Sequence, residues 1–268
     1  MGQLKKQDFA GKALERVKVL NETGGLKTFK EYSPENALKA AVLILQDKKN
    51  KSGVSVLDAC TESSIYNSLL KMVVLGLNPY KHGSFIAYGN ELSFSPEYTG
   101  DVYIAKRDAG VVDVNAQAVY QGDIFEHEIN TDTGVKSVIK HEQKLENLSN
   151  PVIGAYVFVK YFDGKTKVEI MNMQQIKKSW GMRLGKGLTK AHTDFPDEMA
   201  KKTVTRRALK VDTKSSGDES LFSAKKNPVV EKELEIKVKE PEKFEEVEIL
   251  DAAEVEKLAE ENEIPAAF

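Results

Sequence analysis

A run of basic side chains between residues 198 and 210 is the part of the sequence best suited to binding an anion. The run holds one acid, Glu198, and five bases, Lys201, Lys202, Arg206, Arg207 and Lys210. At 100° per residue, Lys202, Arg206 and Lys210 fall on one stripe of a helix, with Arg207 beside them. Unpaired like charges destabilise a helix unless an anion neutralises them, so the stripe predicts contacts with phosphates. A solvated helix surface remains the alternative interpretation.

Residues that could support catalysis or bind a metal do not form a recognisable set. The four histidines, His82, His127, His141 and His192, lack the paired spacing of a metal site, and Cys60 offers no second thiolate. The sequence of residues 180–187 is similar to a phosphate-binding loop motif, but Trp180 stands in place of its first glycine and Gly187 in place of its magnesium-binding Ser or Thr. We therefore expect no metal, no cofactor and no catalysis, and a protein that acts by binding.

A metal-dependent nuclease is kept as a weaker alternative. Pro196-Asp197, followed by Asp212-Thr213-Lys214, imitates a nuclease signature. Asp197 falls in the predicted helix and Asp212 at its polar end, however, and a nuclease would place such aspartates on a buried strand.

The helix that must position the basic residues is predicted over 197–211. Pro196 suits a first helical turn, and Asp197 and Glu198 complement the positive end of the helix dipole. An apolar stripe for packing is formed by Ala200, Val204, Ala208 and Val211. The Gly-rich, basic segment 181–195 leads into this helix.

The rest of the chain predicts an α+β fold. Apolar periodicity indicates amphipathic helices over 5–22, from 34, and over 55–76, and a further helix over 98–109. Alternating patterns and turn residues indicate strands at 84–88, 91–94, 111–120, 124–129, 135–139, 152–162 and 165–171, followed by a short helix over 172–180. We therefore expect N-terminal helices, then a central antiparallel β meander of hairpins packed with helices, including the long basic helix.

Charge is divided unevenly along the 268 residues. Residues 231–268 hold 14 acids and 5 bases, which leaves 27 acids and 34 bases for residues 1–230. A basic body of this kind favours a polyanionic partner. The acidic tail predicts a small helical module or a segment that orders on a partner, with a purely solubilising role as the alternative.

The sequence also indicates a compartment. Cys60 is the single cysteine and cannot form an internal disulfide, which favours a reducing cytoplasm. The N-terminal residues lack the apolar core of a signal peptide, and no apolar run approaches the length of a membrane span. We expect a soluble, intracellular protein.

Four stretches of the sequence resemble the RecT family of phage and prophage single-strand annealing proteins. They are Gly76-Leu77-Asn78-Pro79; Tyr98-Thr99-Gly100 through Ala105-Lys106-Arg107-Asp108-Ala109-Gly110; Val168-Glu169-Ile170-Met171 with Gln175-Ile176; and Glu198-Met199-Ala200-Lys201-Lys202-Thr203 with Arg206-Arg207. Together they span about residues 75 to 210, and the last is the most specific.

The resemblance implies a function and a division of the chain. The function is ATP-independent binding of single-stranded DNA, assembly into rings or helical filaments, and pairing of the bound strand with its complement, in the cytoplasm of a bacterial host. The division is an N-terminal helical region for oligomerisation and packing (1–76), an α+β DNA-binding annealing core (77–212), a flexible linker (213–230) and an acidic partner-binding segment (231–268). A phage exonuclease or the host single-strand-binding protein would be the partner. A passive single-stranded DNA-binding protein is the nearest alternative function.

Two sets of residues are then predicted to contact DNA. Phosphates would be bound by Lys106, Arg107, Lys186, Lys190, Lys201, Lys202, Arg206, Arg207 and Lys210. Bases would stack on Tyr103, Trp180, His192 or Phe195, although core packing is the favoured role for Tyr103 and Trp180. Both single-stranded DNA and the annealed duplex are expected ligands.

Overall fold

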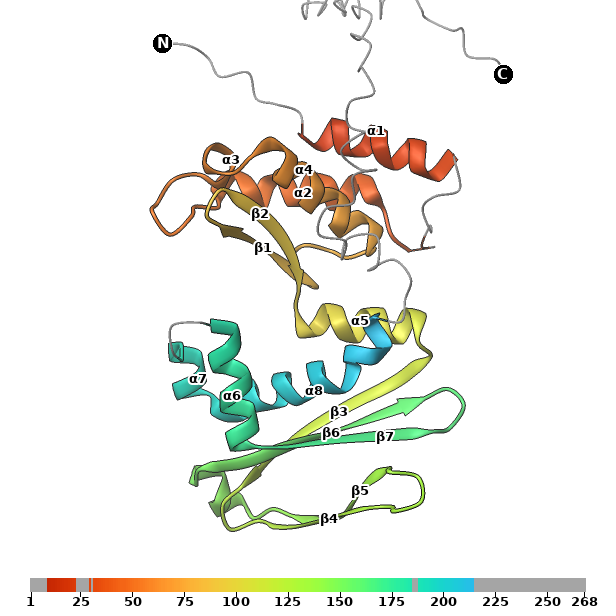
Figure 1. The fold of residues 1–268 in the computed structure, drawn as a ribbon, viewed down its shortest axis with the longest axis vertical. Helices are drawn as coiled ribbons and strands as arrows, with labels where there is room; N and C mark the ends of the chain where they lie inside the picture. Colours follow the sequence, from red (N-terminus) through yellow and green to blue (C-terminus); the bar gives the residue numbers. More distant parts are fainter. Residues whose placement is uncertain (1–8, 23–28, 30, 185–187, 215–268) are drawn as a thin grey trace, which may run out of the picture. The chain divides into compact units, whose positions relative to one another are not determined.

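Two hydrophobic clusters organise the residues that the computed structural model describes, which are 9–22, 29, 31–184 and 188–214 (Figure 1). All of them belong to the first of two units of the chain, residues 1–223. One cluster joins the N-terminal helices to a hairpin, and the other lies between a three-stranded sheet and its covering helices. The predicted α+β class is confirmed. The predicted linker and acidic segment lie outside the described residues, apart from 213 and 214.

The N-terminal layer contains four described helices where three were predicted. They are α1 (Phe9–Glu22), α2 (Pro34–Asp47), α3 (Val56–Ala59) and α4 (Glu62–Val74). The predicted helix over 55–76 is broken after Cys60, because Thr61 has an extended backbone and its hydroxyl accepts a hydrogen bond from the Ser64 amide (3.3 Å). Thr61 is thus the N-cap of a new helix.

The hairpin of β1 (Gly83–Tyr88) and β2 (Glu91–Pro96) packs on these helices. Phe85 and Phe94 face each other across the hairpin and are both buried in the first cluster. Two hydrogen bonds tie β2 to α4: Ser68 Oγ donates to the Leu92 carbonyl (2.8 Å), and Ser64 Oγ accepts from the Leu92 amide (3.0 Å). The domain boundary predicted between residues 76 and 77 stays a prediction, and this hairpin packs across it.

The sheet of the second cluster has the strand order β3-β6-β7 and is antiparallel throughout. It consists of β3 (Val111–Tyr120), β6 (Val152–Tyr161) and β7 (Thr166–Asn172), preceded by helix α5 (Tyr98–Asp108). Strands β4 (Ile124–Ile129) and β5 (Lys136–Glu142) pair only with each other. The predicted meander is therefore interrupted: β3 pairs with β6, whose Val157 and Val159 are fully buried, and the more polar β4–β5 hairpin forms a two-stranded sheet of its own.

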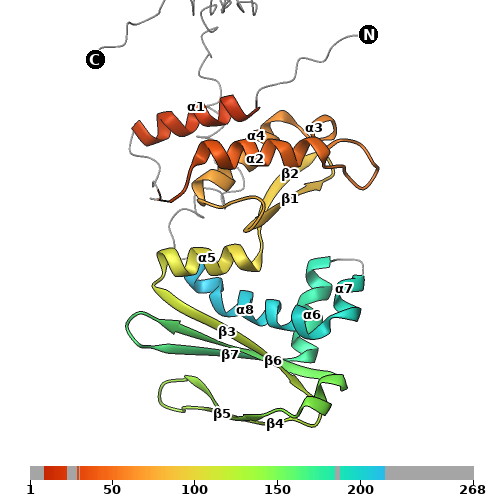
Figure 2. The ribbon, with the colours of Figure 1, turned by 180° about the vertical axis from the view of Figure 1, so that it is seen from behind.

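Helix α8 (Pro196–Lys214) covers the sheet and lies between it and α5, while α6 (Met173–Leu184) and α7 (Lys190–Asp194) pack beside it (Figures 1 and 2). The helix predicted over 197–211 is confirmed, and Ala200, Val204 and Ala208 are buried as expected. Val211 is 70% exposed, which corrects the predicted apolar stripe. Leu209 is buried in its place, because α5 covers a second face of α8.

No described helix has the length and apolar character needed to cross a membrane. Cys60 is free and buried, as expected, and burial raises the pKa of its thiol.

A buried carboxylate fixes the β3–β4 turn. The Asp123 side chain is fully buried and accepts hydrogen bonds from the Tyr120 amide (2.9 Å), Gln143 (2.9 Å), Asn147 (2.9 Å) and His141 (3.2 Å). Burial raises the pKa of this carboxyl, but the four hydrogen bonds outweigh burial and lower the pKa to about 2. Asp123 therefore joins β3, β5 and the 3-10 helix η1 (Leu145–Ser149) through one ionised group.

We predict that Asp123→Asn lowers the free energy of unfolding by about 2–3 kcal/mol at neutral pH, because an amide cannot accept all four hydrogen bonds. The pKa of Asp123 is lower in the folded than in the unfolded chain, so its contribution is complete above pH 4 and is lost as the pH falls toward 2. Urea unfolding at several pH values should show this dependence for the wild type and a flatter one for the variant. Equal pH dependence of the two proteins would contradict the assignment.

Candidate nucleic-acid interface

The two arginines of α8 are ion-paired to carboxylates on other elements. Arg206 Nε lies 2.8 Å from Asp101 Oδ2 on α5, and its Nη2 donates to the Pro96 carbonyl (3.2 Å). Arg207 Nε lies 3.3 Å from Glu169 Oε1 on β7. The expectation that these charges are unpaired was therefore wrong. Helical periodicity shows only the neighbours on the same helix, and these partners come from elsewhere in the fold.

Glu169 serves two cations. Its Oε1 also lies 3.1 Å from Lys136 Nζ on β5, and its side chain is only 16% exposed. Arg207 keeps about half of its side chain exposed, at 49%. One carboxylate between two cations leaves a surplus of positive charge on this side of α8. Lys210, on the last turns of α8, is exposed.

Two of the lysines of α8, Lys201 and Lys202, line a groove. Lys201 is ion-paired with Glu198, three residues before it on the helix, and Lys202 Nζ lies 5.6 Å from the centre of the Tyr98 ring. Both lysines line a hollow of about 350 Å³ between α8, the first turns of α5 and the middle of β3. We call this hollow, with the adjoining one described next, the α8–β3 groove.

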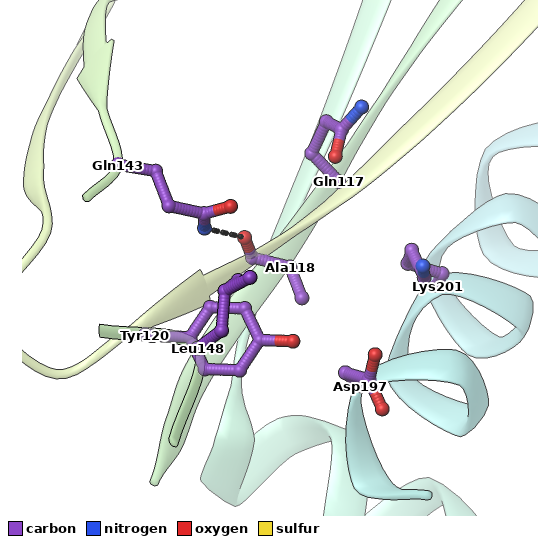
Figure 3. Close-up of a pocket in the computed structure, with 7 residues that line it drawn as sticks. All are labelled: Gln117, Ala118, Tyr120, Gln143, Leu148, Asp197 and Lys201. Carbon is purple, nitrogen blue, oxygen red and sulfur yellow. Dashed lines mark hydrogen bonds between the residues drawn. The ribbon is translucent and has the colours of Figure 1, made fainter. Parts of the chain in front are cut away.

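The adjoining hollow, of about 400 Å³, continues the groove toward the start of α8 (Figure 3). Lys201 lines both hollows, and Asp197 and Lys201 project from α8 opposite Ala118 and Tyr120 of β3. Burial, followed by the charge and hydrogen bond of Asp197, raises the pKa of Tyr120 to about 12. This end of the groove thus carries negative charge, and an anion fits better between Lys201 and Lys202.

The predicted phosphate contacts outside α8 have varied surroundings. Lys106 is exposed on α5, and Lys190 is 91% exposed on α7 with Asp194 4.0 Å away. Lys186 lies outside the described residues. Arg107 is used inside the fold: its guanidinium lies 3.7 Å from the Phe29 ring centre, donates to the Leu75 carbonyl (2.9 Å) and forms two hydrogen bonds to Asp108 (2.6 and 3.0 Å).

The predicted stacking residues also differ in exposure. Trp180 and His192 are buried with ring centres 4.6 Å apart, and Trp180 Nε1 donates to Thr203 Oγ1 (2.7 Å). Burial lowers the pKa of His192. Tyr103 is stacked on His82 at 4.4 Å. Phe195, between α7 and α8, is 61% exposed.

Several groove residues were not singled out from the sequence. Tyr98 and Thr99 begin α5 and line the groove, and Thr99 Oγ1 donates to the Lys81 carbonyl (2.6 Å). Gly100 allows this close packing, because a Cβ there would lie 2.1 Å from the His82 carbonyl oxygen. The stretch that begins at Tyr98 was one basis of the resemblance, so that stretch held the signal, but its role in the groove needed the fold.

The aspartates of the nuclease alternative lie apart. Asp197 and Asp212 are both on α8, and fifteen residues of helix separate them by about 22 Å. Asp212 accepts from Tyr161 Oη (3.0 Å) and pairs with Lys167 (3.2 Å). Within the described ranges, no three His, Cys, Asp or Glu side chains are grouped so as to hold a metal ion.

We predict that Arg107→Lys lowers the free energy of unfolding by about 2–3 kcal/mol, because an ammonium cannot replace the planar contacts with Phe29 and Asp108. Urea unfolding would measure the change. The neighbouring exposed Lys106→Ala should stay within about 0.5 kcal/mol of the wild type. An Arg107→Lys protein as stable as the wild type would show that these contacts are dispensable.

Comparison with known proteins identifies the family of this chain. A family model described as RecT family matches residues 35–248, which is most of the chain. A search of curated proteins found no match. Proteins of the matched family are single-strand annealing proteins of phage DNA recombination. The matched range contains α8 and every element that lines the α8–β3 groove, and the chain belongs to the RecT family.

Proposed function

We propose that this protein anneals complementary DNA strands without ATP, in homologous recombination of a phage within the bacterial cytoplasm. The observation that carries the proposal is the α8–β3 groove, which brings two lysines to an accessible strand edge. The groove offers a ligand the positive charge of these lysines and the backbone of β3. Contacts of this kind suit the phosphates of any strand.

Annealing needs contacts with the backbone only. Two single strands repel each other, and each is held back by its own secondary structure. A protein that neutralises phosphates and leaves the bases accessible lowers both barriers. In this proposal Lys201 and Lys202 contact phosphates in the groove. The basic surface is extended by exposed side chains outside it, which are Lys106, Lys190, Lys210 and the half-exposed Arg207.

The arginines of α8 have a second role in the proposal. Arg206 holds α5 through Asp101, and Arg207 holds β7 through Glu169. The two carboxylates are only about 15% exposed, and removing either guanidinium takes away a cation that compensates one of them. Loss of annealing in an arginine variant could therefore come from lost phosphate contacts or from lost packing. Substitution of the lysines tests the phosphate contacts alone.

Family membership implies binding of single-stranded DNA and oligomerisation. We propose a ring or helical filament in which N-terminal helices contribute subunit contacts. We propose further that the acidic segment 231–268 recruits a phage exonuclease or the host single-strand-binding protein. Its net negative charge would keep it off the DNA groove.

We predict that Lys201→Gln/Lys202→Gln loses most of the acceleration that the wild type gives to pairing of complementary oligonucleotides without nucleotide. The logarithmic salt slope of single-strand binding should shrink by about 1.4, which is 0.7 for each lost phosphate contact. Fluorescence quenching would follow annealing, and anisotropy would follow binding. Lys177→Gln/Lys178→Gln on α6 is the matched control, since it removes the same charge from exposed lysines outside the groove.

The outcomes separate the candidate functions. A wild type that protects single strands without accelerating their pairing is a passive binder. Shortening of end-labelled DNA with magnesium would indicate a nuclease. Normal annealing by the groove variant and impaired annealing by the control would move the DNA site away from this groove.

A second prediction concerns base stacking. Phe195→Ala should weaken binding of a short labelled oligothymidylate about ten-fold, because stacking contributes about 1–3 kcal/mol per base. The exposed ring makes no large contribution to the core, so thermal unfolding should be unchanged. Trp180→Ala should show the reverse pattern, with folding destabilised by about 3 kcal/mol. Wild-type affinity in Phe195→Ala would remove this residue from the interface.

A further inference from the structure

Strand β3 is an edge strand, and hydrogen bonds elsewhere in the sheet show which of its backbone groups face outward. The Tyr161 amide donates to the Lys165 carbonyl (2.9 Å) across the β6–β7 turn. Odd-numbered residues of β6 therefore direct their backbone groups toward β7. Val157 accordingly bonds to its β7 partner Glu169 and leaves Ala116, its neighbour on β3, without a ladder hydrogen bond.

The surroundings of β3 lead to the same orientation. The Ala118 carbonyl accepts from Gln143 Nε2 (3.3 Å), and the Tyr120 amide donates to Asp123 (2.9 Å). Both partners lie outside β6, so the even-numbered residues of β3 turn outward. The amide and carbonyl of Ala116 thus face the open edge, and this residue lines the α8–β3 groove.

The edge is blocked on both sides of Ala116. The Val114 amide donates to Asp113 Oδ1 (2.9 Å), and the Ala118 carbonyl is bonded by Gln143. Side chains that occupy an edge in this way oppose the addition of another strand. A gap one residue wide does not favour an added strand, but it can give one hydrogen bond to a compact ligand.

The groove around this gap favours an anion. Ala116 has a small side chain that leaves its amide approachable, and Lys201 and Lys202 line the same hollow. Glu198 also lines it and offsets part of the charge through its pair with Lys201. Two lysines, one carboxylate and an outward amide leave a net positive site at a sheet edge, an arrangement that binds anions.

We propose that the Ala116 amide, with Lys201 and Lys202, binds one phosphate of the DNA backbone. This assignment rests on the proposed function and names a contact within it. The amide donates one hydrogen bond to a phosphate oxygen and reads no base, as strand pairing without sequence preference requires.

The test replaces the peptide bond before residue 116 by an ester, which removes this N–H and keeps the alanine side chain. Binding of a short labelled oligothymidylate should weaken about ten-fold, since a hydrogen bond to a charged group is lost. The salt slope should stay unchanged, because no cation is removed. The matched control is the ester at Val114, whose outward amide is already bonded to Asp113 and should not affect affinity.

Ala116→Pro offers a second route, since proline is tolerated on an edge strand where the amide faces away from the ladder. It should weaken binding as the ester does, with unchanged unfolding. If the wild type binds DNA and the Ala116 and Val114 esters bind it with equal affinity, the phosphate contact is overturned and the proposed function stays intact. Wild type that does not bind DNA would overturn both. An Ala116 ester with normal DNA affinity but weaker self-association in sedimentation would overturn the phosphate contact. It would show that this strand edge pairs with a second copy of the chain instead.

Discussion

The structure around the groove depends on the ion pairs that hold α8 between α5 and the sheet. A helix buried on two faces has little room for cations, yet α8 carries five between residues 198 and 210. Arg206 and Arg207 meet that constraint by pairing with Asp101 and Glu169, each less than one-fifth exposed. The carboxylate is the more buried member of each pair, so the arginine compensates a negative charge that would otherwise be held near the core. The pairs therefore fix which side of α8 turns toward the groove.

The same contacts explain why the four stretches that resemble the RecT family occur together. Arg206 joins the last stretch to the α5 stretch, and Arg207 joins it to β7. Arg107, in the α5 stretch, bonds to the carbonyl that immediately precedes Gly76. Gly76 has a positive φ of 62°, and a Cβ there would lie 2.7 Å from Arg107 Nη1. Much of the family pattern in this chain thus describes how the core is assembled, and only part of it describes the ligand.

This distinction separates what the sequence could predict from what it could not. Local signals identified most strands, α5 and α8, because alternation, helical periodicity and turn residues act within a few residues. They did not reveal the break at Thr61, where one hydroxyl starts a new helix, or the pairing of β3 with β6 across an inserted hairpin. The basic helix was found, but its charges were assigned to one anion-binding face. The partners of Arg206 and Arg207 lie far away in the chain, and no short-range pattern encodes such contacts.

The division between arginine and lysine on α8 follows from their chemistry. A guanidinium is planar and weakly hydrated, so it suits a lasting pair with a buried carboxylate, whereas an ammonium on a flexible stem is strongly hydrated and exchanges partners readily. An annealing protein needs both properties on one helix. Its scaffold must stay fixed while the bound strand shifts register in search of its complement, and contacts that are individually weak and indifferent to sequence permit that movement. In the function proposed above, Lys201 and Lys202 in the groove, beside an outward amide of β3, would provide contacts of that kind, while the paired arginines hold α8 against α5 and β7.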